Sequence, residues 1–389
     1  MESGSLLFSF FLIFSGAAVL ASVALFTRQP LLVAYIVLGA ILGPYGMELV
    51  NDTDLLNDIA HVGIIFLLFL LGLDMQPSHL GTLLKRTATV GLLSSLIFAL
   101  TGFGLGLAFG FTQKEALIMG ATMMFSSTII GIKLLPTTVL HHKHTGEVLV
   151  SLLLLQDLLA ILVLLLLYNL EGGFASSQND ILMALAALPL LIMAAYCAVR
   201  FILLPLMARF DRFHEYMFLL AIGWCLGFAE LAHALNLSYE IGAFIAGVSL
   251  ATSPISQYIA INLKPLRDFF LVLFFFSIGA SFNLALWEQV WIPSLVLTAV
   301  CLLIKPATFG FLLKRNESKS TAWEVGFRLG QTSEFSILIS VLAASQLLIG
   351  SVAAHVIQAT AILTLIFSSY VVVFNFESPI AVSEKLRRD

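Results

Sequence analysis

The sequence predicts an all-α, polytopic membrane protein, and three observations support this fold class. Of the 389 residues, 60% are hydrophobic and only 11% are charged, a balance outside the range of soluble globular chains. The mean hydropathy is +1.02. The apolar residues form runs of about 20, which is the length that an α-helix needs to cross the hydrocarbon core of a bilayer.

We predict about thirteen transmembrane helices from these runs. The ninth and tenth are short, and the break predicted between them contains Pro254 and Pro265, so twelve or fourteen spans are the alternatives. In chain order, the predicted spans cover residues 5–26, 30–47, 55–73, 83–109, 113–135, 145–168, 180–208, 214–235, 239–252, 265–280, 287–313, 321–346 and 351–376.

The distribution of basic residues predicts the orientation of the chain. With the N-terminus outside, 15 of the 19 Lys and Arg residues fall in cytoplasmic loops or in the C-terminal tail, as the positive-inside rule requires. We therefore predict a transmembrane domain over 1–376 and a short basic cytoplasmic tail over 377–389. The net charge of -4 argues against a nucleic-acid partner, since a phosphate backbone needs a basic surface.

Two pairs of segments resemble each other within the chain: LGAILGPYG with IGAFIAGVS, and FLLFLLGLDMQPSHL with LFFFSIGASFNLALW. Gly39 and Gly242 are 203 residues apart, and Gly72 and Gly279 are 207 residues apart. The paired segments are seven helices apart, an odd number, so the copies face opposite sides of the membrane. Inverted-topology repeats of this kind are the architecture of secondary transporters. The alternative is a chance recurrence of small and apolar residues. The repeats are predicted at about 30–168 and 239–376.

The predicted helix at 145–168 contains Gln156 and Asp157 at its centre, within SLLLLQDLLAILVLLLL. A charged carboxylate at mid-membrane costs about 2.5–3.5 kcal/mol on insertion scales, so it usually faces the protein interior and has a function. Burial favours the protonated carboxyl and a nearby cation favours the carboxylate, so a proton and a cation compete for one group. Asp157 is therefore our candidate ion-binding group and proton carrier, and Gln156 is a candidate ligand. The alternative is a structural Asp paired only with a Lys.

Two polar clusters fall on each other at the same offset of 207 residues, MMFSSTIIG on LGQTSEFSI, each near the middle of its span. Such clusters suit a helix interrupted at mid-membrane, where side-chain and freed backbone oxygens can replace the water around an ion. The alternative is that the hydroxyls bond back to their own helix. The candidate ion ligands are Ser126, Ser127 and Thr128, with Gln331 and Ser333 as secondary candidates.

Four further charged residues are predicted near or within spans. We expect Lys305 to reach Asp157 or Glu334 and thereby to tune the charge of the site, with Glu334 as the second tuning group. The alternative is that Lys305 extends to the cytoplasmic interface, as Arg328 is expected to do. Glu240, at the outer end of its span, is a secondary ligand candidate or an interfacial charge.

Seven stretches are distinctive when taken as a set: FLLFLLGLDMQP, FSSTI, LLLLQDLLAI, LSYEIGAFIAGVSLA, KPLRDFFLVLFFFSIGASF, LLIK and LGQTSEF. In this order they resemble the membrane domain of the second family of monovalent cation:proton antiporters, in particular its Kef-type potassium efflux branch. The resemblance covers nearly the whole chain. It implies a homodimer with a mobile core domain, and two crossing discontinuous helices at 113–135 and 321–346. The Gln-Asp pair resembles the potassium-carrying form, whose single carboxylate implies electroneutral exchange.

We therefore predict a secondary active antiporter that exchanges a monovalent cation, K⁺ first of all, for H⁺ by alternating access at Asp157. Na⁺/H⁺ exchange by the same fold and a cation channel are the alternatives. The sequence contains no nucleophile and base pair, phosphate loop or zinc motif, so we expect no enzyme, no cofactor and no transition metal. The expected partners are membrane lipid, a second copy of the chain, and a cytoplasmic regulatory domain or subunit. The expected location is a bacterial inner membrane.

Overall fold

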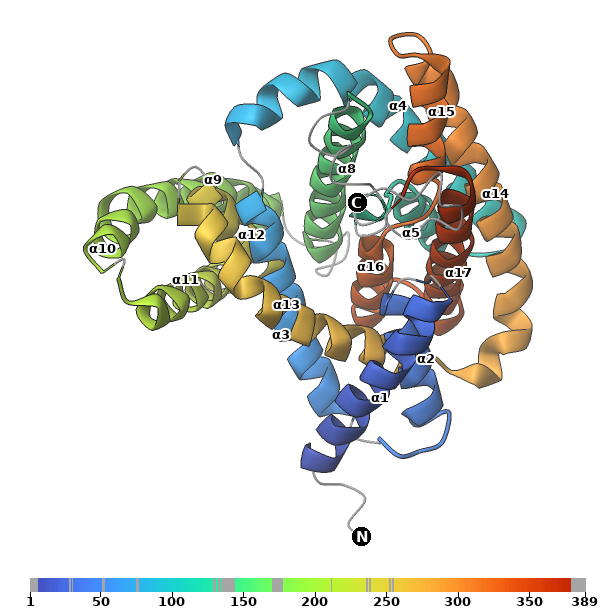
Figure 1. Cartoon of the computed structure of the whole chain (residues 1–389), viewed down its shortest axis with the longest axis horizontal. Helices are drawn as coiled ribbons and strands as arrows, with labels where there is room; N and C mark the ends of the chain where they lie inside the picture. The colour runs from blue at the N-terminus through green and yellow to red at the C-terminus, as the bar shows by residue number, and fades with distance from the viewer. Residues whose placement is uncertain are drawn as a thin grey trace. The chain divides into compact units, whose positions relative to one another are not determined.

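The computed structural model is built from helices throughout the part of the chain that it describes (Figure 1). The described residues are all those outside positions 1–5, 28, 30, 51–52, 75–76, 129–130, 132–133, 135–143, 170–177, 211, 236, 238, 252, 254 and 379–389.

The helices follow one another along the chain with short connections. They are α1 (Leu6–Phe26), α2 (Leu31–Leu42), α3 (Thr53–Asp74), α4 (Pro77–Ala108), α5 (Gln113–Met123), α8 (His144–Asn169), α9 (Gln178–Ala198), the π-helical turn η1 (Val199–Leu203), α10 (Leu204–Arg209), α11 (His214–Ala234), α12 (Tyr239–Ala251), α13 (Ile255–Ala280), the 3₁₀ turn η2 (Leu284–Leu286), α14 (Trp287–Leu313), α15 (Lys319–Arg328), α16 (Glu334–Ser345) and α17 (Ser351–Asn375).

The chain forms two compact units. The first contains α3 and the helices from α9 to α13, and the second contains α5, α14 to α17 and most of α4 and α8. In residues, the first unit is Met1–Gly16, Leu38–Gly81 and Leu164–Ser281, and the second is Ala17–Val37, Thr82–Val163 and Phe282–Asp389.

The helices have the length and composition of membrane spans. Seven of those in the described part of the chain are long and apolar enough to cross a bilayer, and shorter apolar helices lie at 31–42, 241–251 and 334–345. α4 exposes Leu92, Leu96 and Leu100 at a spacing of four residues, which gives one face of this helix an apolar stripe suited to lipid. The prediction of an all-α, polytopic membrane protein is confirmed, and the total of about thirteen spans stays a prediction.

The break predicted between the ninth and tenth spans is wrong in its second half. α13 begins at Ile255 and continues through Pro265 without ending. Proline removes one backbone N–H and so weakens a helix locally, but membrane helices tolerate it because neighbouring groups satisfy the freed carbonyl. The tenth predicted span therefore starts one long helix earlier than the proline suggested. Pro254 lies outside the described residues.

Glycines pack the two predicted repeats against each other within the first unit. A Cβ atom on Gly39 of α2 would overlap the carbonyl oxygen of Phe276 in α13, and a Cβ atom on Gly247 of α12 would overlap the carbonyl oxygen of Phe69 in α3. Phe69 and Phe276 are 207 residues apart, which is the offset of the repeat. The first helix of each repeat thus meets the second helix of the other, as a two-fold relation between the repeats would require. The repeat boundaries stay predictions.

The second unit holds the two polar clusters on closely packed helices. A Cβ atom on Gly102 of α4 would lie 2.8 Å from the Cα atom of Gly120 in α5, and one on Gly106 would lie 2.9 Å from the Cα atom of Ala116, so these small residues bring α4 and α5 into backbone contact. α14 packs along α15 and α17, while α16 contacts both α5 and α17. Figure 1 shows α16 and α17 side by side.

The glycine contacts generate a prediction about stability. We expect Gly247→Ala to lower the melting temperature of the detergent-solubilised protein, because the added methyl group must displace the backbone of α3 at a cost of about 1–3 kcal/mol. Gly223→Ala in α11 is the matched control, since no atom lies within 4 Å of the position of its Cβ, and it should leave the melting temperature unchanged or higher. Equal melting temperatures for the two variants would contradict the close approach of α12 and α3.

Candidate functional site

The carboxylate that the sequence places at mid-membrane lies inside the second unit, on α8. Asp157 is 1% exposed and Gln156 is fully buried. Neither carboxylate oxygen of Asp157 has a hydrogen-bond partner. A buried carboxylate without donors is costly unless a proton or a cation neutralises it, so Asp157 is suited to binding one or the other.

The first interrupted helix is α5, which ends at Met123. The chain from Met124 to Ser127 is not helical, and the two neighbouring serines favour such a break because their hydroxyls compete for backbone groups. The backbone N–H of Ser126, which loses its helical partner here, donates to Oε1 of Gln156 at 3.0 Å. The polar residue before Asp157 therefore holds the break of α5 against α8.

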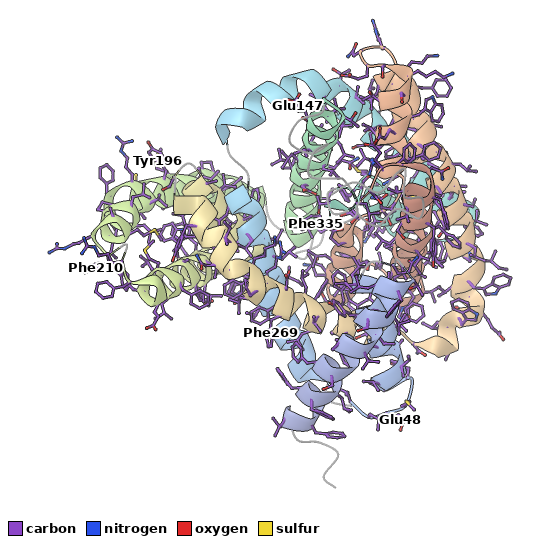
Figure 2. The ribbon with its side chains drawn as sticks, in the orientation of Figure 1. Glu48, Glu147, Tyr196, Phe210, Phe269 and Phe335 are labelled. Atoms are coloured by element: carbon purple, nitrogen blue, oxygen red, sulfur yellow. The ribbon has the colours of Figure 1, made fainter. Side chains whose placement is uncertain are left out.

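The second interrupted helix consists of α15 and α16, which residues 329–333 separate. Ser333 is the N-cap of α16, and its hydroxyl accepts a hydrogen bond from the backbone N–H of Phe335 at 3.1 Å. Figure 2 labels Phe335 at this end of α16. The backbone N–H of Thr332 donates to the hydroxyl of Thr364 on α17 at 3.1 Å. Side-chain oxygens thus satisfy the backbone groups that the break releases.

The two breaks meet each other. The hydroxyl of Ser126 donates to the carbonyl oxygen of Leu329 at 2.9 Å, and the amide of Gln331 donates to the carbonyl oxygen of Ser127 at 3.4 Å. The carbonyl of Gln331 in turn accepts from the hydroxyl of Ser368 at 2.8 Å. The described part of the two interrupted helices therefore crosses as the resemblance implied. The continuation of the first helix beyond Thr128 lies mostly outside the described residues.

A single lysine bridges the two breaks. Lys305 in α14 is fully buried, and its ammonium donates to the carbonyl oxygens of Phe125 at 2.6 Å and Gln331 at 2.9 Å. It also donates to the hydroxyl of Ser126 at 3.3 Å. Its Nζ atom lies 5.2 Å from the centre of the Phe98 ring, a cation–π contact.

The prediction that Lys305 reaches a carboxylate is therefore wrong, and so is the alternative that it extends to the interface. Its donors point to carbonyl and hydroxyl oxygens, and the oxygens of Asp157 have no partner. The physical reason is that helices broken within lipid expose carbonyl groups that need donors, and an ammonium supplies three donors at one point. Lys305 can influence the site only through the field of its charge.

A second buried carboxyl lies beside the crossing. Glu334 is the first residue of α16 and is 7% exposed. The hydroxyl of Thr128 donates to its Oε1 atom at 2.6 Å, while its Oε2 atom has no partner. Its charge is close enough to Asp157 for the two to repel each other.

Arg328 corrects another expectation. It is 1% exposed and does not reach the interface, because it forms an ion pair with Glu324 at 2.9 Å and donates to the carbonyl oxygens of Leu134 at 3.0 Å and Glu377 at 2.6 Å. Its own carbonyl oxygen accepts from Gln331 at 3.0 Å. Arg328 thus ties the end of α15 to the segment that follows α17.

The structure brings most of the predicted residues together in the second unit. The exception is Glu240, which belongs to α12, and whose side chain lies outside the described residues. The sequence reasoning missed Thr364 and Ser368. Their spacing of four residues places both hydroxyls on one face of an otherwise apolar helix, and this was the available signal. The residues brought together are Ser126, Ser127, Thr128, Gln156, Asp157, Lys305, Gln331, Ser333 and Glu334.

Comparisons with known proteins agree with this arrangement. A family model described as "Sodium/hydrogen exchanger, transmembrane" matches residues 10–377. K(+) efflux antiporter 6 from Arabidopsis thaliana is 30% identical over 322 residues, which are 80% of this chain and 53% of that protein. The iron transporter MagA from Paramagnetospirillum magneticum is 27% identical over 353 residues, 88% of this chain and 79% of that protein. The chain thus spans about half the length of the first of these relatives.

A solved structure has the same fold. The sodium proton antiporter MjNhaP1 from Methanocaldococcus jannaschii superposes with a TM-score of 0.67 and 18% sequence identity, over 92% of this chain and 94% of that one. At this identity the likeness concerns the fold alone. Together with the family match, it confirms the resemblance to cation:proton antiporters.

The bridging lysine generates a prediction about stability. We expect Lys305→Met to lower the melting temperature in detergent, because an unsatisfied buried carbonyl costs about 1–3 kcal/mol and the variant leaves two without their donor. Lys305→Gln should be less destabilising, since its amide can still donate. Lys314→Met, at the exposed end of the same helix, is the matched control. If Lys305→Met melted like this control, the bridge between the breaks would not matter for folding.

Proposed function

The chain belongs to the sodium/hydrogen exchanger family of transmembrane proteins, and from this premise we propose that it exchanges K⁺ for H⁺ at Asp157 by alternating access. The exchange of a monovalent cation for a proton follows from the family. The identity of the cation and the role of Asp157 are the parts that we add.

One observation supports the role of Asp157 above all others. Its carboxyl group is buried in the second unit, and neither of its oxygens has a hydrogen-bond partner among the described residues. An ionised carboxylate in such surroundings is unstable by several kcal/mol. A proton or a bound cation removes this cost, and the empty, charged site is the species that is least able to change conformation within the membrane.

The coupling of the two fluxes follows from this competition. When the site faces one side of the membrane, a cation displaces the proton from the carboxyl group, and when it faces the other side, a proton displaces the cation. Each ion shifts the conformational equilibrium only through its own binding energy. Because the occupied forms cross and the empty form does not, the gradient of one ion drives the other.

The neighbouring oxygens complete the proposed ion site. Gln156 uses one lone pair of its carbonyl for Ser126 and retains a second for an ion. The oxygens of Ser127 and Thr128 are further ligands. The hydroxyl of Ser126 already donates to Leu329 and accepts from Lys305, which favours a positioning role for it over direct ligation. Such a set of hard oxygen donors suits an alkali cation.

Potassium is the proposed cation for two reasons. A neutral amide beside the carboxylate gives a site of low charge, which suits a large and weakly hydrated ion. The similar protein from Arabidopsis thaliana is named a K(+) efflux antiporter. Sodium is the alternative within the same mechanism. We further propose a homodimer in a bacterial inner membrane, with the N-terminus outside and the C-terminus in the cytoplasm.

The first test of this function removes the carboxylate. In proteoliposomes with a trapped pH dye, Asp157→Asn should abolish the proton flux that a K⁺ gradient drives, and the variant should still fold because it loses only a costly charge. The exposed Asp268→Asn is the matched control and should keep wild-type flux. If Asp157→Asn also kept wild-type flux, Asp157 would not be the carrier.

The second test concerns ion choice and charge movement. The wild type should respond more strongly to K⁺ than to Na⁺ in the same dye assay, without net charge transfer. Gln156→Asp adds a second negative charge beside Asp157, so we expect it to change the ion preference or to make transport electrogenic. These changes are measured as dye responses to each cation and as currents on a supported membrane. Unchanged preference together with unchanged current would remove the basis for choosing potassium.

A further inference from the structure

We propose that Glu334 is the second carboxyl group of the exchange site, so that one proton is held by Asp157 and Glu334 together and a single monovalent cation replaces it. This inference rests on the proposed function of Asp157 and goes beyond it. A single carboxylate was expected from the sequence, and the structure brings a second one to the same place.

The surroundings of Glu334 are those of a binding group. The residue is 7% exposed, at the first position of α16. Its Oε1 atom accepts from Thr128, which belongs to the break of α5, while its Oε2 atom is buried and without a partner. A helix begins here, and its dipole favours a negative charge. The orphaned oxygen, together with the two orphaned oxygens of Asp157, gives the site three buried acceptors in need of a positive partner.

The charged groups on the neighbouring elements do not supply that partner by contact. Lys305 of α14 spends its donors on carbonyl and hydroxyl oxygens at the crossing. Arg328 of α15 spends its donors on Glu324 and on two carbonyl oxygens. α8 contributes Asp157, and the contacts of α17 near the site come from hydroxyl groups. His355, the histidine of α17, is bonded to Asn283 and Ser351 instead.

Charge balance then fixes the exchange. Arg328 is balanced by Glu324, so the site contains one fixed positive charge, on Lys305, and two carboxyl groups. Electrical neutrality requires one more positive charge, and a proton on either carboxyl supplies it. When a cation enters, the O–H bond breaks, the proton leaves to solution, and both carboxylates face the cation and the field of Lys305. Both states are neutral, which favours them in a buried site. Two coupled carboxyls of this kind titrate as a pair.

The same balance predicts an unusual pattern of variants. In Glu334→Gln, the charge of Lys305 already neutralises Asp157, so no proton needs to be bound or released. In Glu334→Gln/Lys305→Gln, the fixed charge is also gone, and Asp157 alone again needs a proton or a cation. Loss of exchange in the single variant should therefore be reversed in the double variant. A merely structural role of Glu334 predicts no such rescue.

The experiment measures protons released on addition of KCl to the full-length, detergent-solubilised protein in weakly buffered solution, with NaCl as a second arm and melting curves to verify folding. The wild type and the exposed Glu288→Gln control should release protons. Glu334→Gln should lose the release, and Glu334→Gln/Lys305→Gln should regain it. Wild-type release from folded Glu334→Gln, or a folded double variant as silent as the single one, would overturn the inference.

A second measurement needs no variant. Dicyclohexylcarbodiimide modifies protonated carboxyls in apolar surroundings, and mass spectrometry of the wild-type protein locates the adducts. We expect labelling at both Asp157 and Glu334 without K⁺ and protection of both by K⁺. Labelling of Asp157 alone would overturn the role of Glu334 and leave the proposed function standing. Wild-type proton release from Asp157→Asn would instead overturn the proposed function itself.

Discussion

The ammonium of Lys305 among the carbonyl groups of two interrupted helices is the contact on which the site depends. Helices broken within lipid leave backbone groups that no water can reach, and such groups must find donors inside the protein. Lys305 donates to one carbonyl from each break and to the hydroxyl of Ser126. Because these contacts use its donors, the lysine cannot also hold a carboxylate, and Asp157 is left without a protein partner.

This division of tasks explains why the site can exchange ions at all. A carboxylate held by a lysine would gain little from a proton or a cation, since its charge would already be neutralised. Here the fixed charge stabilises the backbone, and the carboxyl groups depend on mobile ions. Gln156 connects the two parts, because its carbonyl binds the backbone of Ser126 directly beside Asp157 in the sequence. The ion at Asp157 and the geometry of the break are therefore neighbours in one hydrogen-bonded network.

Much of this arrangement could be predicted from the sequence, and the failures have physical causes. The apolar runs predicted the spans, and the polar clusters predicted both breaks because the serines, threonine and glutamine near mid-membrane have few other uses. The partner of Lys305 was not predictable, because side chains attract attention in a sequence and released backbone carbonyls do not. The path of α13 through Pro265 failed for a related reason: a proline ends helices in water more reliably than in a membrane. Arg328 likewise found carbonyl groups that no motif announces.

The central claim is that one buried site holds either a proton or a cation. It is tested most directly by calorimetric titration of K⁺ into the solubilised wild-type protein at a series of pH values. If the two ions compete for Asp157, the Kd for K⁺ should rise by about tenfold for each unit that the pH falls, over the range in which the exchanged proton is bound. A Kd for K⁺ that stays constant across this range would contradict the account.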